Sequence, residues 1–324
     1  MPTRIWLAGA TGYIGRALAR ELAARGHEVT AILRPGAGAA AATEAALVGC
    51  RWIEVDLESP TAAEAALEGQ AVDVVFSCIA SRTGVAEDAR RVDHGANVRL
   101  LAAARRAGAR HFVLLSAICV QRPLLAFQHA KLAFEAELMR SDLAWSIVRP
   151  TAFFKSLAGQ VERVRGGKPF LVFGDGALTA CKPIGEADLA RYLADCMDDP
   201  ARRDRILPIG GPGPAITPRQ QGELLARLAG VEPRIRSVPV GIFDAAATLL
   251  GAGGRLSKSL AAKAELARIG RYYATESMLL WNAERQAYDA EATPETGTET
   301  LEGFYERVLR DGLEGQELGA AKVF

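Results

Sequence analysis

Lys131 stands four residues after Phe127, in a segment whose apolar and polar residues predict a helix over 124–140. Positions four apart share one face of a helix. A lysine there can donate hydrogen bonds to the hydroxyl groups of a bound ligand and can lower the pKa of a nearby acid, although an ordinary exposed lysine fits the same spacing. Phe127 carries no acidic proton, so its ring either packs against a ligand or fills the core.

Ser116 ends an apolar run that predicts a strand over 111–115, and the stretch from Ser116 to Lys131 resembles the active-site frame of short-chain dehydrogenases. In that frame a tyrosine at the position of Phe127 exchanges a proton with a carbonyl or alcohol oxygen. The resemblance therefore predicts a nicotinamide enzyme that does not reduce a carbonyl group. His129 is a weaker candidate for an acid, because positions two apart do not share a helix face. The other candidate proton donors are Ser116, Cys119, Gln121 and a water molecule.

A glycine-rich turn follows the first predicted strand, residues 4–8, and opens the first predicted helix. Glycine permits a sharp turn and a close approach of the backbone to a pyrophosphate, while the first N–H groups of the helix carry partial positive charge. This G-x-x-G-x-x-G spacing between a strand and a helix predicts dinucleotide binding, with a purely structural turn as the alternative. The predicted cofactor contacts in the turn are Gly9, Thr11, Gly12, Tyr13, Ile14 and Gly15.

Arg34 follows the second predicted strand, residues 27–33, where NAD-preferring sites usually have an acidic residue. An arginine there can pair with the 2′-phosphate of NADP, and Arg16 can reach the same phosphate; a solvated surface arginine is the alternative. We therefore predict NADPH as the cofactor. Further contacts are predicted from topology at the ends of the third and fourth strands, where simple packing fits equally well: Asp56, Cys78 and Ala80.

A regular alternation of strands and helices must position these residues. The predicted strands are 4–8, 27–33, 50–56, 72–78, 111–115, 144–148 and 205–209. The alternation predicts an α/β protein of the Rossmann type, with a doubly wound parallel sheet and a smaller, mainly helical C-terminal substrate lobe. Ligands bind at the carboxyl edge of such a sheet, which places Pro150 and Thr151 at the nicotinamide. Phe153 and Phe154 offer flat apolar surface there, unless one of them fills the core.

The alternation loosens after the sixth predicted strand, which sets the expected domain boundaries. We expect an NADP-binding domain over residues 1–150, with 184–230 partly returning to it, and a substrate-binding lobe over 151–183 and 231–324. Residues 239–250 predict a short apolar helix. We interpret it as a core helix of the lobe, with a lid over the substrate or a membrane-surface contact as alternatives.

Composition excludes several classes of protein. A chain of 324 residues can bury a large core, and a net charge of +1 gives no reason to expect nucleic acid as a partner. The five cysteines and four histidines lack disulfide or metal-ligand spacing, which predicts free thiols in a reducing compartment and no metal site. No apolar run approaches the about 18 residues of a membrane span, and the chain starts directly with a strand. We therefore expect a cytoplasmic protein with peripheral membrane contact at most.

Several stretches resemble the flavin-free, NADPH-dependent divinyl chlorophyllide a 8-vinyl-reductases, an atypical short-chain dehydrogenase family. They are Gly9–Gly15, Ser116–Lys131, Val148–Ser156, Phe173–Gly176, Cys181–Pro183, Leu207–Pro212, Gly270–Leu279 and Gly315–Leu318. The resemblance implies an enzyme of chlorophyll or bacteriochlorophyll synthesis. Its substrate would be a tetrapyrrole, divinyl chlorophyllide a or protochlorophyllide, whose 8-vinyl group is reduced with NADPH.

This implied reaction agrees with phenylalanine at position 127, because a carbon–carbon double bond has no oxygen that needs an acid. We hypothesise that hydride adds to the terminal vinyl carbon and that the inner carbon takes a proton from water or a nearby acid. The magnesium of the macrocycle belongs to the substrate. Two alternatives fit the same residues: a non-catalytic NADP-sensing Rossmann protein, and a reductase of another conjugated C=C bond.

Overall fold

The computed structural model describes residues 2–254 and 257–313 of the chain. The stretch Gly315–Leu318, which contributes to the family resemblance, lies outside the described residues. The chain divides into two compact units. The first comprises residues 1–149 and 189–207, and the second comprises residues 150–188 and 208–324.

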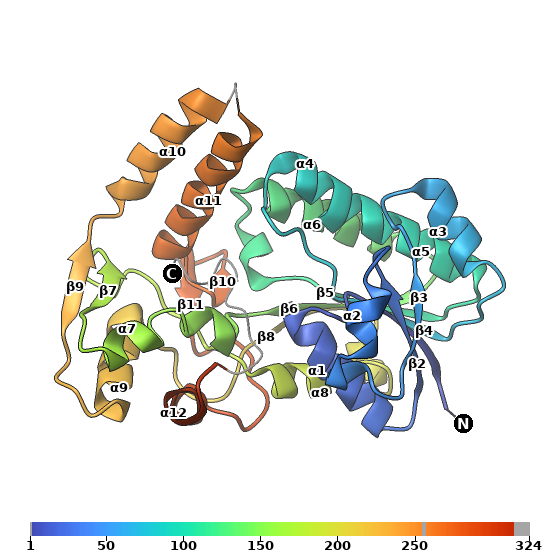
Figure 1. The fold of residues 1–324 in the computed structure, drawn as a ribbon, viewed down its shortest axis with the longest axis horizontal. Coiled ribbons are helices and arrows are strands. Elements are labelled where there is room, and N and C mark those ends of the chain that lie inside the picture. The colour runs from blue at the N-terminus through green and yellow to red at the C-terminus, as the bar shows by residue number, and fades with distance from the viewer. Residues whose placement is uncertain (1, 255–256, 314–324) are drawn as a thin grey trace. The chain divides into compact units, whose positions relative to one another are not determined.

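A seven-stranded sheet with the order β3-β2-β1-β4-β5-β6-β8 forms the centre of the first unit (Figure 1). Its strands are β1 (Arg4–Ala8), β2 (Glu28–Leu33), β3 (Arg51–Glu54), β4 (Val74–Ser77), β5 (His111–Leu115), β6 (Ala144–Pro150) and β8 (Arg205–Ile209). The five neighbouring pairs from β3 to β6 are parallel. The strands from β3 to β6 have the order of dinucleotide-binding sheets. In such sheets the order in which strands are added reverses between β1 and β4. The predicted Rossmann fold is therefore confirmed.

Helices cover both faces of this sheet. Those of the first part of the chain are α1 (Tyr13–Ala24), α2 (Gly38–Ala42), α3 (Pro60–Leu67), α4 (Ala86–Ala89), α5 (Asn97–Arg106) and α6 (Ala126–Met139), joined by short helices η1 (Ala45–Leu47) and η3 (Ile118–Gln121). Later in the chain come α8 (Glu186–Asp195) and η5 (Pro200–Arg202). Side chains of α3, α5 and α6 form one buried cluster with the sheet. In this cluster the ring centroids of Phe112 and Phe134 lie 5.7 Å apart. Helix α1 lies on the opposite face (Figure 1).

The amphipathic pattern of residues 86–106 predicts one long helix, and a π-helix, η2 (Arg90–Ala96), interrupts it. It joins α4 to α5, so the three segments follow one another without a loop. The π-helix places one extra residue in a turn and thereby changes which side chains face the core. Apolar periodicity alone did not predict this change.

The second unit contains short strands as well as helices. Its elements are η4 (Phe154–Leu157), α7 (Val161–Arg165), β7 (Phe170–Phe173), α9 (Pro218–Leu228), β9 (Ile235–Val238), α10 (Gly241–Gly254), α11 (Lys258–Thr275), β10 (Leu280–Asn282), β11 (Ala287–Asp289) and α12 (Leu301–Asp311). Strands β7 and β9 pair in parallel, and β10 pairs antiparallel with β11. The unit has its own apolar core, in which Phe154 packs against Phe304.

Helix α10 is not the core helix that the sequence suggested. Every residue from Gly241 to Gly253 is half-buried or exposed, and the helix lies beside α11 as one arm of a hairpin (Figure 1). The side chains of Ile242 and Leu249 are 55% and 76% exposed. They are seven positions apart and therefore share one face of the helix.

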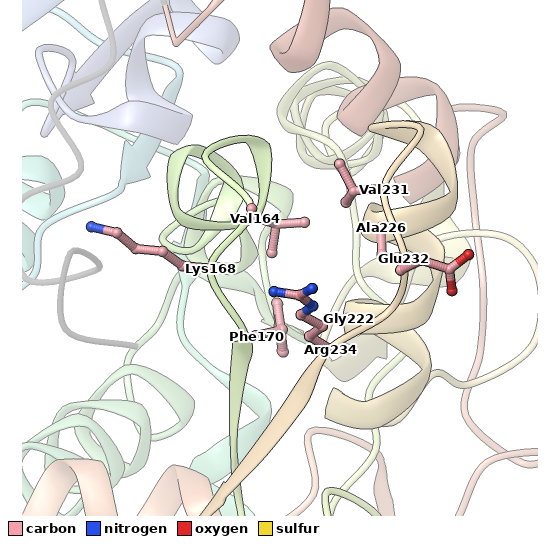
Figure 2. A pocket seen from close by; sticks show the side chains of 9 residues that line it. Val164, Lys168, Phe170, Gly222, Ala226, Val231, Glu232 and Arg234 are labelled. Carbon is pink, nitrogen blue, oxygen red and sulfur yellow. The ribbon is translucent and has the colours of Figure 1, made fainter.

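A pocket of about 310 Å³ lies among α7, β7, α9 and β9 in the second unit (Figure 2). The Arg234 side chain extends into it, whereas the amino group of Lys168 points away. None of the residues predicted for the functional site lines this pocket. Within residues 2–254 and 257–313, no helix combines the length and apolar character that crossing a membrane requires.

Candidate functional site

The turn between β1 and α1 has no space for side chains at two of its glycines. Gly9 has a φ of +83°, and a Cβ there would lie 2.6 Å from the carbonyl oxygen of Cys78. A Cβ on Gly15 would lie 2.1 Å from the carbonyl oxygen of Gly9. Thr11 and Gly12 are exposed, and no side chain of the described residues caps the start of α1. Exposed backbone at an uncapped helix N-terminus fits the pyrophosphate of a dinucleotide.

Arg34 is exposed directly after β2, in a loop that a carboxylate holds in place. Glu54 on β3 accepts hydrogen bonds from the N–H groups of Gly36 and Gly38, at 2.8 and 2.7 Å, and these bonds hold the pKa of Glu54 below its ordinary value. Arg16, the second candidate for a phosphate contact, instead pairs with Glu44 at 3.1 Å. Of the two arginines predicted to contact the 2′-phosphate, Arg34 is therefore the exposed one, and Arg16 is paired with a carboxylate.

The ends of β3 and β4 carry the contacts predicted from topology. Asp56 is half-buried and accepts a hydrogen bond from the N–H of Glu58 at 2.9 Å. Cys78 donates its N–H to the carbonyl of Ala8 at 2.9 Å, which joins the end of β4 to the end of β1. Burial raises the pKa of the Cys78 thiol to about 12, against the opposing influence of the Lys131 charge. Cys78 is thus a neutral thiol, and Ala80 is exposed two residues further on.

Lys131 forms a nearly buried ion pair with Asp93. Its Nζ lies 3.0 Å from Asp93 Oδ1, and the two side chains are 11% and 1% exposed. Lys131 is therefore not an ordinary surface lysine. Asp93 was not predicted from the sequence, although its spacing from buried Asn97 and Leu100 on the same helical stretch is a usable signal.

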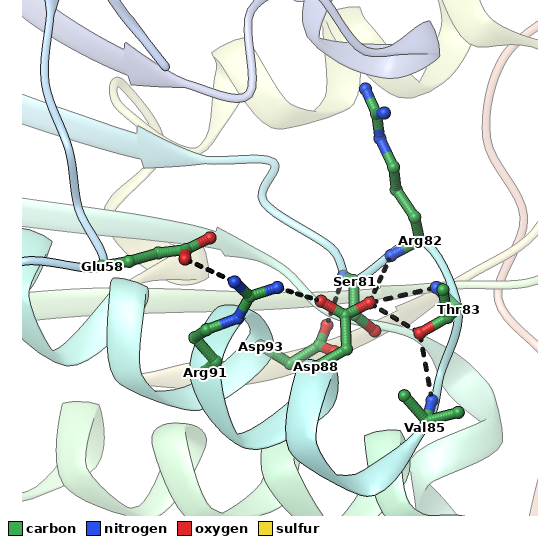
Figure 3. Close-up of polar contacts among 8 residues, drawn as sticks. All are labelled: Glu58, Ser81, Arg82, Thr83, Val85, Asp88, Arg91 and Asp93. Carbon is green, nitrogen blue, oxygen red and sulfur yellow. Dashed lines mark hydrogen bonds and ion pairs between the residues drawn. The ribbon is translucent and has the colours of Figure 1, made fainter. Parts of the chain in front are cut away.

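Polar contacts fix the loop that leaves β4 (Figure 3). Ser81 donates its N–H to Asp93 Oδ1 at 3.3 Å. Thr83 donates both its N–H and its hydroxyl to Asp88, at 3.1 and 2.8 Å. Arg91 donates to Asp88 at 3.0 Å and to Glu58 at 2.7 Å. Burial alone would raise the pKa of Asp88, but the bonds from Thr83 and Arg91 outweigh it and lower that pKa. The segment after Cys78 and Ala80 is therefore held against α4 and η2.

Ser116 belongs to a second buried polar cluster. Its hydroxyl donates to Glu135 Oε1 at 2.5 Å, and Arg149 donates from Nε to the same oxygen at 3.2 Å and from Nη2 to Oε2. Ser116 and Glu135 are 6% and 1% exposed. Glu135 and Arg149 were not predicted from the sequence. The signals were the placement of Glu135 one helical turn after Lys131 and of Arg149 at the end of the sixth strand.

The buried side chain of Gln128 fixes the start of α6. Gln128 is fully buried, accepts the N–H of Leu125 at 2.8 Å and donates to the carbonyl of Cys119 at 3.1 Å. Phe127 is half-buried and His129 is exposed, so the two neighbours of Gln128 have different environments.

The residues after β6 belong to the second unit, and within that unit they divide between core and surface. Phe154 is 1% exposed and its ring centroid lies 5.4 Å from that of Phe304, which confirms the core alternative for this ring. Phe153 is half-buried and bridges to Ile184, while Pro150 is buried. Pro150 and Phe153 stay predicted cofactor contacts.

Comparison with known proteins extends these observations. The NAD(P)H-binding protein family matches residues 9–200. Among solved structures, an NADPH-dependent quinone oxidoreductase from Escherichia coli in complex with NADPH has a TM-score of 0.67 and 18% identity, covering 94% of this chain and 99% of its own. At that identity the likeness supports the fold alone.

Relatives of higher identity are found in plants. The chloroplastic divinyl chlorophyllide a 8-vinyl-reductase of Oryza sativa subsp. indica is 49% identical over 99% of this chain and 82% of its own length. The protein of the same name in Arabidopsis thaliana is 47% identical over 97% of this chain and 79% of its own length. With near half identity along almost its whole length, the chain belongs to the divinyl chlorophyllide a 8-vinyl-reductase family.

Proposed function

We propose that this protein reduces the 8-vinyl group of a divinyl chlorophyllide to an ethyl group with NADPH, as a step of chlorophyll or bacteriochlorophyll synthesis. The observation that carries the proposal is the end-to-end similarity to reductases of that name. The site supports it chemically, because Lys131 is present and nearly buried while Phe127 has no proton to give to an oxygen.

The cofactor would bind along the carboxyl edge of the sheet. The turn from Gly9 to Gly15 and the N-terminus of α1 would bind the pyrophosphate, since backbone N–H groups and the helix dipole favour an anion there. Arg34 would pair with the 2′-phosphate, and Lys131 would donate hydrogen bonds to the nicotinamide ribose. When bound, NADPH supplies the hydride. The protein contributes the orientation of the cofactor and of the reacting group.

The residues around Lys131 favour water as the proton source. Ser116 already donates its hydroxyl hydrogen to Glu135, and the Glu135 charge is paired with Arg149. This arrangement fixes the end of β5, and the partner of Ser116 among the described residues is a charge-paired carboxylate rather than an acid that could resupply its proton. Phe127 would contribute an apolar surface one helical turn before Lys131. Hydride addition to the vinyl group would leave the negative charge on carbon rather than on an oxygen beside position 127, and the inner carbon would take its proton from water.

The finer assignments concern the substrate and the membrane. We propose divinyl chlorophyllide a as the preferred pigment, with protochlorophyllide as the competitor in the assay. The pocket of about 310 Å³ in the second unit is at the lower limit for small-molecule sites, so we do not assign the macrocycle to it.

Peripheral membrane contact is proposed for α10, through exposed Ile242 and Leu249.

A reconstituted assay tests the proposed function. Purified protein, NADPH and 3,8-divinyl chlorophyllide a are incubated without flavin, and the product is identified by the blue shift of its Soret band and by chromatography. Divinyl protochlorophyllide is run in parallel. Formation of the 8-ethyl product with NADPH alone is the expected result. Cofactor binding without any product would instead favour the non-catalytic sensor, and a requirement for flavin would contradict the proposal.

A further inference from the structure

We propose that Asp93 is a positioning residue, which holds the Lys131 ammonium in place for the nicotinamide ribose and compensates its charge. The inference rests on the proposed role of Lys131 as a cofactor ligand. Asp93 is not expected to touch the cofactor or the substrate itself. Its effect would pass entirely through the Lys131 side chain.

The contacts of Asp93 make Lys131 its main partner. Oδ1 accepts the Lys131 ammonium at 3.0 Å and the Ser81 N–H at 3.3 Å. Oδ2 is buried and has no hydrogen-bond partner in the described part of the chain. An ionised carboxylate ordinarily accepts several hydrogen bonds, and a buried one needs a compensating charge. Neither member of this pair can therefore leave the other without a large cost.

The backbone at Asp93 is itself fixed to the cofactor edge of the sheet. Asn97 donates from Nδ2 to the carbonyl of Asp93 at 2.9 Å and accepts the hydroxyl of Ser77, the last residue of β4, at 2.5 Å. All three side chains are at most 1% exposed. Asp93 also lies within the π-helix η2, and such interruptions are frequent at functional sites. The strand that ends beside Gly9 is thus coupled through Asn97 and Asp93 to Lys131.

Charge compensation gives Lys131 a limited role that suits this reaction. A lysine beside a tyrosine lowers the pKa of the phenol through its positive charge. Here Asp93 compensates that charge, and the adjacent position on the helix face is Phe127. The ammonium has three N–H donors, so pairing with Asp93 leaves donors for ribose hydroxyls. Lys131 would thus orient the cofactor without activating an acid.

A double-mutant cycle on NADPH binding tests the inference without requiring turnover. The dissociation constant is measured from NADPH fluorescence for wild type, Asp93→Asn, Lys131→Met and the double variant. We expect each single variant to raise Kd about tenfold or more, and the double variant to bind no more weakly than Lys131→Met. Wild-type affinity in Asp93→Asn, or effects that multiply in the double variant, would overturn the inference.

Glu137→Gln is the matched control. The His94 Nε2 lies 2.6 Å from Glu137 Oε1, so this pair also joins η2 to α6 without involving Lys131. Its Kd should stay within about twofold of wild type, because only contacts at the ammonium matter. An equal loss in Glu137→Gln would assign the effect to general loosening of η2 against α6 and overturn the positioning role.

Folding and turnover are followed in the same preparations. If Asp93→Asn does not fold, Asp93→Glu keeps the charge but moves it by one methylene, and a raised Kd is again expected; a folded Asp93→Glu with wild-type Kd overturns the inference. Wild-type conversion of divinyl chlorophyllide is measured alongside. An absent Asp93–Lys131 coupling with intact conversion overturns only the positioning role, whereas absent conversion with intact coupling overturns only the proposed reaction.

Discussion

Phe127 and Lys131 occupy one face of α6, and their environments now distinguish them. Lys131 forms an ion pair with a buried carboxylate, whereas Phe127 is half-buried and its ring has no polar atom. Substitution of Phe127 should therefore be tolerated more readily than substitution of Lys131. Substitution of Lys131 should also reduce the reaction more than substitution of Phe127, because Lys131 is the proposed cofactor ligand.

Phe127→Tyr should leave vinyl reduction largely intact. We expect kcat/KM for divinyl chlorophyllide to change by less than about fivefold, which is under about 1 kcal/mol, because the reaction needs no phenol. Product formation by chromatography measures it, with a carbonyl substrate tested in parallel. Strong carbonyl reduction by the variant, with no vinyl product from either protein, would contradict the mechanism.

Arg34→Ala should reduce the preference for NADPH over NADH. A charged hydrogen bond to phosphate contributes about 1.5–3 kcal/mol, so we expect the KM for NADPH to rise by about tenfold to a hundredfold with little change for NADH. Steady-state kinetics with both cofactors measure it. Arg16→Ala is the control, because Arg16 pairs with Glu44. If Arg16→Ala has the larger effect, the phosphate contact belongs to Arg16.

At the residue scale, the sequence predicted the groups that local spacing defines. The glycines of the first turn and the Phe127–Lys131 pair are of this kind. Asp93 and Glu135 were not predicted, because their importance comes from partners on other elements, Lys131 on α6 and Arg149 on β6. A carboxylate in an amphipathic helix looks the same in the sequence whether it is solvated or buried.

At the element scale, the β1–α1 turn gives a steric prediction. Gly15→Ala places a Cβ 2.1 Å from the carbonyl oxygen of Gly9, so the turn must move away from its cofactor-binding form. We expect NADPH affinity to fall about tenfold or more, with a loss of thermal stability. Fluorescence titration and thermal denaturation measure the two effects.

Gly303→Ala provides the control for that variant. Gly303 is in α12, where the nearest atom to a new Cβ is Thr300 Oγ1 at 3.5 Å, an ordinary contact. Because alanine favours the helix over glycine, this variant should be neutral or more stable by up to about 1 kcal/mol. Loss of NADPH binding in Gly303→Ala would show that the Gly15 result has no specific meaning for the turn.

Strand β5 gives a prediction about pH. His111 is buried, its Nε2 lies 3.0 Å from Ser146 Oγ on β6, and burial lowers its pKa to about 4. An unfolded histidine titrates near about 6.5, so between these values the unfolded chain binds more protons and stability falls as pH falls. By about pH 5 this group should cost about 2 kcal/mol relative to neutral pH.

His111→Gln should remove that part of the acid sensitivity. Urea denaturation at neutral pH and at about pH 5 gives the difference in unfolding free energy for wild type and variant. The same pair of measurements on His129→Gln, at an exposed position of α6, serves as the control. Equal acid sensitivity in wild type and His111→Gln would assign the destabilisation to other groups.

Element length explains which elements were predicted. Strands β1, β2, β5 and β6 have five to seven residues and a clear apolar pattern. Strands β10 and β11 have three residues each, which is too short for a period to be recognised. Strands β7 and β9 have four residues, as β3 and β4 do, but they lie outside the regular strand–helix alternation from which β3 and β4 were predicted. The π-helix was missed because a single extra residue in a helical turn leaves the surrounding pattern nearly unchanged.

At the scale of the whole molecule, the exposed face of α10 predicts membrane association. Ile242→Asp combined with Leu249→Asp should reduce cosedimentation with vesicles that contain anionic lipid, because apolar contact with the interface is lost. Leu178→Asp is the matched control, since Leu178 is 51% exposed outside α10. Equal vesicle binding by the double variant and wild type would contradict a role of this helix.

The discontinuous first unit has a consequence for synthesis on the ribosome. Residues 189–207 return to that unit after the intervening segment 150–188 has been made. Until β8 emerges, β6 is the last strand of the growing sheet, and its backbone N–H and C=O groups lack a partner on one side. Nascent chains stalled before residue 205 should therefore need chaperones to prevent edge-to-edge association, whereas chains that have released β8 should not.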